Sequence, residues 1–113
     1  MTFREARGFR SRLLGLAFRD ELDPDEALVF RRCRSIHTFG MRVPIDVVFV
    51  DRSWRELRVV RSLRPRRVAG CRGAHAAIEV AAGEADRLLA ALSPMRARAG
   101  GTTAPTAPGP LSR

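Results

Sequence analysis

The longest apolar run in the chain predicts a central β-strand. This run is Ile45–Val50, in which only Asp46 is polar and four of the six residues are β-branched. Apolar side chains at odd and even positions alike are typical of a strand that is buried on both faces. Pro44 precedes the run and predicts a bend at its start. The stretch from Ser35 to Asp51 is therefore expected to organise the fold.

Shorter apolar runs predict further strands around the central one. Asp51–Ser53 has the composition of a tight turn, so we expect Trp54–Leu63 to form an antiparallel hairpin with the central strand. Ala27–Phe30 predicts a buried strand, and Thr2–Ala6 predicts a short edge strand.

The second half of the chain predicts one more strand and a helix. In Ala76–Val80, Ile78 is expected to point inward and Glu79 outward, because side chains alternate along a strand. Glu84–Leu92 has apolar side chains at helical spacing, and two acids in its first turn suit the helix dipole. Helical spacing also predicts a short helix over Phe9–Phe18.

The C-terminal residues differ in composition from the rest. Residues 93–113 are rich in Pro, Ala, Gly and Thr and offer too little apolar surface to offset the entropy of ordering. We therefore expect a single mostly β domain over residues 1–92 and a disordered tail over residues 93–113. No run reaches the ~18 apolar residues of a membrane span, and the first residues contain no signal-peptide apolar segment. The resulting expectation is a cytoplasmic protein with two reduced cysteines.

The net charge of +9 comes from arginine, because all 21 basic residues are Arg. The chain also contains no Lys, Asn, Gln or Tyr, and a GC-rich genome favours such a composition. The arginine content can therefore reflect codon composition as much as selection for an anionic partner. Guanidinium groups nevertheless bind phosphates and carboxylates in a bidentate manner. Nucleic acid is an alternative partner, ranked below a protein or a small anionic molecule.

Several segments together resemble a prokaryotic family known as domain of unknown function 192. The resemblance lies in the order and spacing of Arg12–Leu22, Leu28–Phe30, Pro44–Asp51 and Ile78–Gly83. It implies a compact, mostly antiparallel, barrel-like β domain with one or two short helices, and it implies no known activity, substrate or cofactor. The chain departs from the family at Phe39-Gly40, where many members have lysine and asparagine.

Polar residues around the central strand define a candidate binding surface. Aspartate is depleted in strands, so Asp46 is expected to accept backbone hydrogen bonds, to pair with an arginine, or to face His37 as an acid–base pair. No nucleophile motif accompanies this pair, which favours a structural role. The surface is expected where the start of the central stretch meets a basic loop. Its candidate residues are Ser35, His37, Thr38, Arg42, Asp46, Arg64, Arg66 and Arg67.

The two cysteines repeat one spacing, Cys33 with His37 and Cys71 with His75. Two Cys and two His could hold zinc, but strand geometry places positions i and i+4 about 13 Å apart. We therefore predict no metal and no cofactor. Cys33 and Cys71 are expected to be either in contact with each other or unrelated.

These observations favour a non-catalytic binding or accessory module. The first alternative is a small enzyme that uses His37 and Asp46 as an acid–base pair, and a pocket containing both would favour it. The second is an arginine-driven binder of nucleic acid or another anionic ligand, which a continuous arginine stripe would favour.

Overall fold

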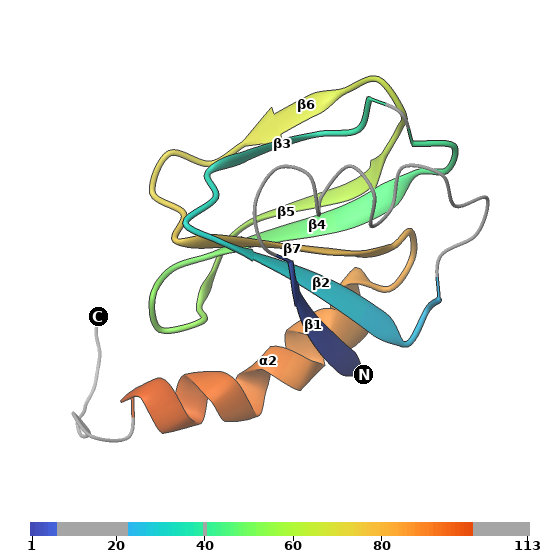
Figure 1. The fold of residues 1–113 in the computed structure, drawn as a ribbon. Helices are drawn as coiled ribbons and strands as arrows, with labels where there is room; N and C mark the ends of the chain where they lie inside the picture. Colours follow the sequence, from blue (N-terminus) through green and yellow to red (C-terminus); the bar gives the residue numbers. More distant parts are fainter. Residues whose placement is uncertain (7–22, 40, 101–113) are drawn as a thin grey trace.

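Two β-sheets and one helix make up the described part of the protein (Figure 1). The computed structural model describes residues 1–6, 23–39 and 41–100. Five strands form a sheet in the order β1-β2-β7-β4-β5, and β3 and β6 form a separate two-stranded sheet. The elements are β1 (Thr2–Ala6), β2 (Glu26–Arg31), β3 (Ser35–His37), β4 (Ile45–Val50), β5 (Glu56–Leu63), β6 (Val68–Gly70), β7 (Ala76–Ala81) and α2 (Ala85–Gly100).

Strand β4 lies within the five-stranded sheet, as the sequence predicts. It pairs antiparallel with β5 on one side and with β7 on the other. All six of its residues are buried, which confirms the predicted two-sided burial. The predicted hairpin is also present, with Val48 of β4 opposite Val59 of β5. Strand β1 is at the edge of the sheet and pairs in parallel with β2.

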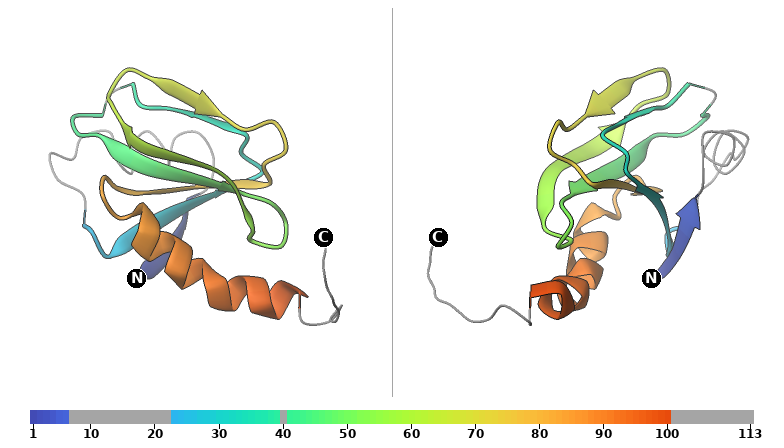
Figure 2. Two further views of the ribbon diagram at one scale, coloured as in Figure 1. Left: turned by 180° about the vertical axis from the view of Figure 1, so that it is seen from behind. Right: turned by 60° about the vertical axis from the view of Figure 1, so that its left-hand side comes forward.

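The five-stranded sheet has a hydrophobic core on each face, under α2 on one side and under β3 and β6 on the other; Figure 2 shows these layers. Side chains alternate along a strand, so Val48 of β4 packs on the helix side with Ile78 and Leu88. Phe49 points to the opposite face, where it packs in one cluster with Ile36 of β3. The apolar residues at odd and even positions of β4 therefore pack in two different cores, one on each face of the sheet.

The two-stranded sheet β3–β6, called the ribbon below, covers the face opposite to α2 (Figures 1 and 2). Ile36 of β3 pairs with Ala69 of β6, and both side chains are buried in the cluster under the ribbon. The alternating positions face outward, where His37 lies opposite Val68. The ribbon thus has an apolar inner face and an outer face of mixed character.

The strands do not close into the expected barrel. Among the described residues the ribbon is a sheet of its own, and no backbone ladder joins it to β5 or β2. Arg58 of β5 instead donates a side-chain hydrogen bond to the carbonyl oxygen of Gly70. Each ribbon strand has only three residues, which leaves few backbone groups for further pairing. The fold is mainly β with one C-terminal helix.

Helix α2 begins one residue after its predicted start but continues to Gly100, through part of the predicted tail. Leu88 and Leu92 are buried, and Met95 extends their stripe at a spacing of three residues and packs on the same core. Pro94 lies inside the helix without ending it. The helix is neither long nor apolar enough to cross a membrane. Residues 101–113 and the helix predicted over residues 9–18 lie outside the described part.

Glu79 corrects the prediction for β7. Its side chain was expected to face solvent, yet the residue is only 2% exposed. Strand β7 lies between β2 and β4, and each face of the sheet is covered by a further layer. A strand in this position has no solvent face, whatever the polarity of its residues.

Candidate functional site

The buried hydroxyl of Thr38 joins the end of the ribbon to the basic loop 64–67. Its Oγ1 donates to the carbonyl oxygen of Arg64 at 2.6 Å and accepts from the backbone N–H of Arg67 at 2.8 Å. The carbonyl oxygen of Thr38 accepts from the backbone N–H of Arg66 at 3.2 Å. Thr38 is itself 0% exposed. The two polar segments singled out in the sequence therefore meet, and Thr38 fixes the loop from beneath.

Two exposed apolar side chains lie beside this loop. Val68 is 65% exposed and Phe39 is 52% exposed. They are connected through His37, which lies opposite Val68 in the ribbon and whose ring centroid is 5.6 Å from that of Phe39. Sequence reasoning missed both, although an apolar residue beside a basic loop is a detectable signal. We call the outer face formed by His37, Phe39, Arg64, Arg66, Arg67 and Val68 the ribbon surface.

The backbone of the basic loop adopts a defined conformation. Arg66 has φ = 64°, in the left-handed region that glycine tolerates best. The hydrogen bonds from the loop to Thr38 hold this conformation in place. The exposed side chains of Arg64, Arg66 and Arg67 thus project from a backbone fixed by Thr38.

Asp46 has a structural position far from this surface. Its Oδ2 accepts hydrogen bonds from the backbone N–H groups of Gly83 and Ala85, both at 3.0 Å, and its Oδ1 accepts from that of Ser62 at 2.8 Å. The side chain is only 1% exposed. It therefore caps the N-terminus of α2 and joins that helix to β5.

The alternative pairing of Asp46 with His37 is not formed. In β4, Asp46 alternates with Ile45 and Val47, which pack under the ribbon, so it faces the helix side of the sheet. His37 lies on the ribbon at the other face. The two side chains are separated by the sheet itself, and no proton can pass directly between them.

The remaining candidate residues lie around the ribbon. Ser35 is exposed two positions before His37 in β3, and Gly70 lies opposite it. A Cβ at Gly70 would come within 3.3 Å of the carbonyl oxygen of Arg34, so the strands could not approach this closely with a larger residue. Arg42 is exposed in the segment that follows Thr38.

Cys33 and Cys71 are not joined by a disulfide in this structure. Cys33 is buried and its Sγ donates to the carbonyl oxygen of Ser35 at 3.0 Å. Cys71 packs against the same apolar cluster under the ribbon. Among the residues that the structure describes, no three His, Cys, Asp or Glu side chains gather in a way that could hold a metal ion.

The fold and site define a small, mainly β domain with a basic, partly apolar ribbon surface. The chain belongs to the family DUF192 (domain of unknown function 192), described as "Uncharacterized ACR", whose model matches residues 1–91. A search of curated proteins finds no match.

Two solved structures are similar to this chain, each with a TM-score of 0.66. One is a protein of unknown function from Novosphingobium aromaticivorans, with 26% identity over 76% of this chain and 66% of that chain. The other, from Sinorhizobium meliloti, is described as a candidate transcription regulator and has 20% identity over 76% of this chain and 72% of that chain. The second likeness concerns the fold alone.

Proposed function

We propose that this protein is a non-catalytic binding module, and that its ribbon surface binds an acidic segment of a partner protein. The observation that carries this proposal is the position of exposed Phe39 and Val68 beside three exposed arginines. Aromatic residues and arginine are enriched in the centres of protein interfaces. A free surface with this composition is typical of a docking site.

The charge of the ribbon surface indicates an acidic partner. Neither residues 35–44 nor residues 64–70 contain an Asp or Glu. The guanidinium groups of Arg64, Arg66 and Arg67 are therefore not offset by a carboxylate from their own segments. Complementary charge would speed association and set orientation, and the apolar side chains would supply contact area.

Two further features support this function over the alternatives. The sheet between His37 and Asp46 supports a binding role over an acid–base enzyme, because an acid–base pair must reach one bound substrate. The two thiols support a cytoplasmic location, where cysteines are kept reduced.

A labelled peptide in which glutamates alternate with leucines tests the proposal. We expect the peptide to bind the protein, and the double variant Phe39→Ser/Val68→Ser to weaken binding by about tenfold or more. The triple variant Arg64→Ser/Arg66→Asn/Arg67→Ser should also weaken it, with asparagine chosen because it tolerates a positive φ. Leu57→Ser is the matched control, since Leu57 is a 45% exposed apolar residue outside the ribbon surface.

Two outcomes would contradict the proposal. Equal losses from Leu57→Ser and from the Phe39/Val68 variant would show that the peptide does not use the ribbon surface. Inorganic polyphosphate is the second probe. If its binding is weakened by the arginine variant but not by the Phe39/Val68 variant, the site binds a small or polymeric anion and not a protein segment.

A further inference from the structure

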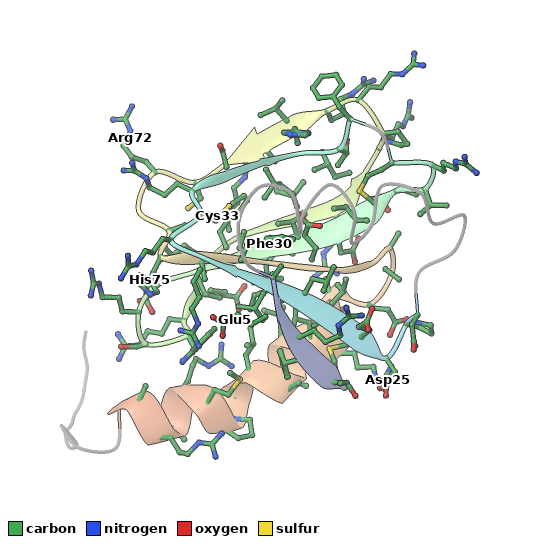
Figure 3. The ribbon with its side chains drawn as sticks, viewed as in Figure 1. Glu5, Asp25, Phe30, Cys33, Arg72 and His75 are labelled. Atoms are coloured by element: carbon green, nitrogen blue, oxygen red, sulfur yellow. The ribbon has the colours of Figure 1, made fainter. Side chains whose placement is uncertain are left out.

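At one end of the molecule, exposed arginines are paired with acids. Near β1 and the start of α2, arginines lie beside acids: Arg4 pairs with Glu26 at 2.8 Å, and Arg87 contacts Asp25. The labelled Asp25 lies at the lower right in Figure 3, on the side away from Arg72.

Three turns meet at the opposite end of the sheet. They are residues 31–34, 51–55 and 71–75, on the left in Figure 1. The backbone N–H of Arg32 donates to the carbonyl oxygen of His75, and that of His75 donates to the carbonyl oxygen of Val50. The N–H of Cys71 donates to the carbonyl oxygen of Arg34. Turns that are far apart in the sequence therefore form one continuous end of the molecule.

Five exposed arginines project from these turns. We call this group the arginine turns, and its members are Arg32, Arg34, Arg52, Arg55 and Arg72. Figure 3 shows Arg72 on the same side of the molecule as Cys33 and His75.

The charge of the arginine turns is not neutralised locally. Within the part of the chain that the structure describes, none of the five side chains forms an ion pair or a hydrogen bond. The one carboxylate in the three turns is Asp51. Its Oδ1 accepts from the backbone N–H groups of Ser53 and Arg55, at 2.8 and 3.0 Å, and so is used within its own turn.

Backbone strain accompanies this charge. Arg32 has φ = 55° and Trp54 has φ = 65°, both in the left-handed region where glycine would be unstrained. The guanidinium of Arg31 lies over the Trp54 ring, 5.2 Å from its centroid, and joins two of the turns. Strained residues held by their surroundings occur preferentially at functional sites.

We propose that the arginine turns bind the phosphate backbone of nucleic acid. Guanidinium groups on three separate turns suit a ligand with regularly repeated anionic groups, and each group can bind a phosphate in bidentate fashion. None of the exposed large apolar residues of the described chain belongs to these turns, although Leu57 lies against Gly73. The arginine turns therefore have no large exposed apolar side chain of their own to insert into a membrane. The contacts concern phosphates, so binding is independent of base sequence.

The test uses labelled duplex DNA and single-stranded RNA of equal length and measures affinity over a range of salt concentrations. The triple variant Arg52→Ser/Arg55→Ser/Arg72→Ser should bind more weakly. The slope of log affinity against log salt should become shallower by about 2.7 on duplex DNA, at ~0.9 for each lost phosphate contact. Tighter binding of one probe would identify the type of nucleic acid that the protein prefers. Equal binding of both would show that the protein recognises the phosphodiester group that the two probes share.

The matched control is the triple variant Arg64→Ser/Arg66→Asn/Arg67→Ser, which removes the same charge from the ribbon surface. Its salt slope should stay close to that of the unmodified protein. The variant Arg52→Lys/Arg55→Lys/Arg72→Lys keeps the three charges, so its salt slope should stay close to that of the unmodified protein. Comparison with the serine variant then shows that the change in slope comes from the lost charges and not from unfolding. If the two charge-removing variants change the salt slope equally, the proposal is wrong, because the binding would then depend only on the net charge of the protein. No binding to either probe at low salt would also overturn it. The inference does not depend on the ribbon surface.

Discussion

At the scale of single residues, Asp46 shows how a buried carboxylate can be structural. The chain gives it three backbone N–H donors, from Ser62, Gly83 and Ala85. Two of these are at the start of α2, where the helix dipole also favours a negative charge. Ser62 has φ = 52°, so the third bond holds a strained residue of β5. One side chain thus fixes a helix and a strand to the same point of the central sheet.

Replacing Asp46 by alanine should lower the free energy of unfolding by about 3–5 kcal/mol. Hydrogen bonds to charged groups contribute ~1.5–3 kcal/mol each, and the N–H groups of exposed Gly83 and buried Ala85 would lose their acceptor. Asp46→Asn should cost less, since it keeps one acceptor oxygen. Urea unfolding measures both, with Glu56→Gln at an exposed position as the control. A loss below about 1 kcal/mol for the alanine variant would show that Asp46 is not the anchor.

At the scale of elements, α2 shows a helix sustained by its packing. Its first half follows the sequence pattern, with Ala85, Leu88 and Leu92 all 0% exposed. Its second half contains Pro94, which cannot donate the hydrogen bond that closes a helical turn. Met95, the residue after Pro94, packs on the core below the sheet, and the helix continues to Gly100. Contact with the sheet therefore offsets an unfavourable local propensity.

Pro94→Ala should accordingly stabilise the protein by about 1–3 kcal/mol. Alanine restores one backbone hydrogen bond and removes the clash of the proline ring with the preceding turn. Pro94 is exposed, so the change should remove no core contact. Thermal unfolding followed by far-ultraviolet circular dichroism measures the effect. Pro24→Ala, in the turn before β2, is the control for a proline outside a helix. An unchanged or lower melting temperature for Pro94→Ala would mean that proline suits the helix at this position.

At the scale of the whole molecule, ion pairs that join distant segments make the stability depend on pH. The N-terminal ammonium donates a hydrogen bond that, together with its charge, holds the pKa of Asp25 below its ordinary value. The hydrogen bond from Arg61 likewise lowers the pKa of Asp86. A carboxyl whose pKa is lower in the folded protein contributes stability above its unfolded pKa of about 3.9 and loses it as the pH falls through the folded pKa.

The melting temperature should therefore decline below pH ~4, and Asp86→Asn should make this decline slightly shallower. The effect should be small, because Asp86 and Arg61 are exposed and solvent screens their interaction. Arg61→Ser should have a similar effect, and the double variant should add little to either single variant. Fully additive effects in calorimetry at several pH values would show that the pair does not couple.

The described fold follows the sequence most closely where local pattern and burial agree. The run Ile45–Val50 is buried on both faces, and its hairpin partner is found where the turn at Asp51–Ser53 places it. The spacing of Leu88 and Leu92 predicts the buried face of the helix. Strand period, turn composition and helix period are properties of short segments, and so they can be read from the chain alone.

The candidate site followed the sequence only in part. The meeting of residues 35–38 with the loop 64–67 is present, but Thr38 lies beneath it as an anchor and Asp46 lies across the sheet. Glu79 is buried because β7 has a neighbouring strand on each side. The arginine turns meet only because β2 and β4 end, and β7 begins, at the same side of the sheet. Sequence alone determined the central strand, its hairpin partner, the other strands of the five-stranded sheet and the first half of the helix, but neither the ribbon strands β3 and β6 nor the helix beyond Leu92. Only the tertiary structure decided which polar side chains are covered and which charges are brought together, because strand order and layer packing depend on contacts between residues far apart in the chain.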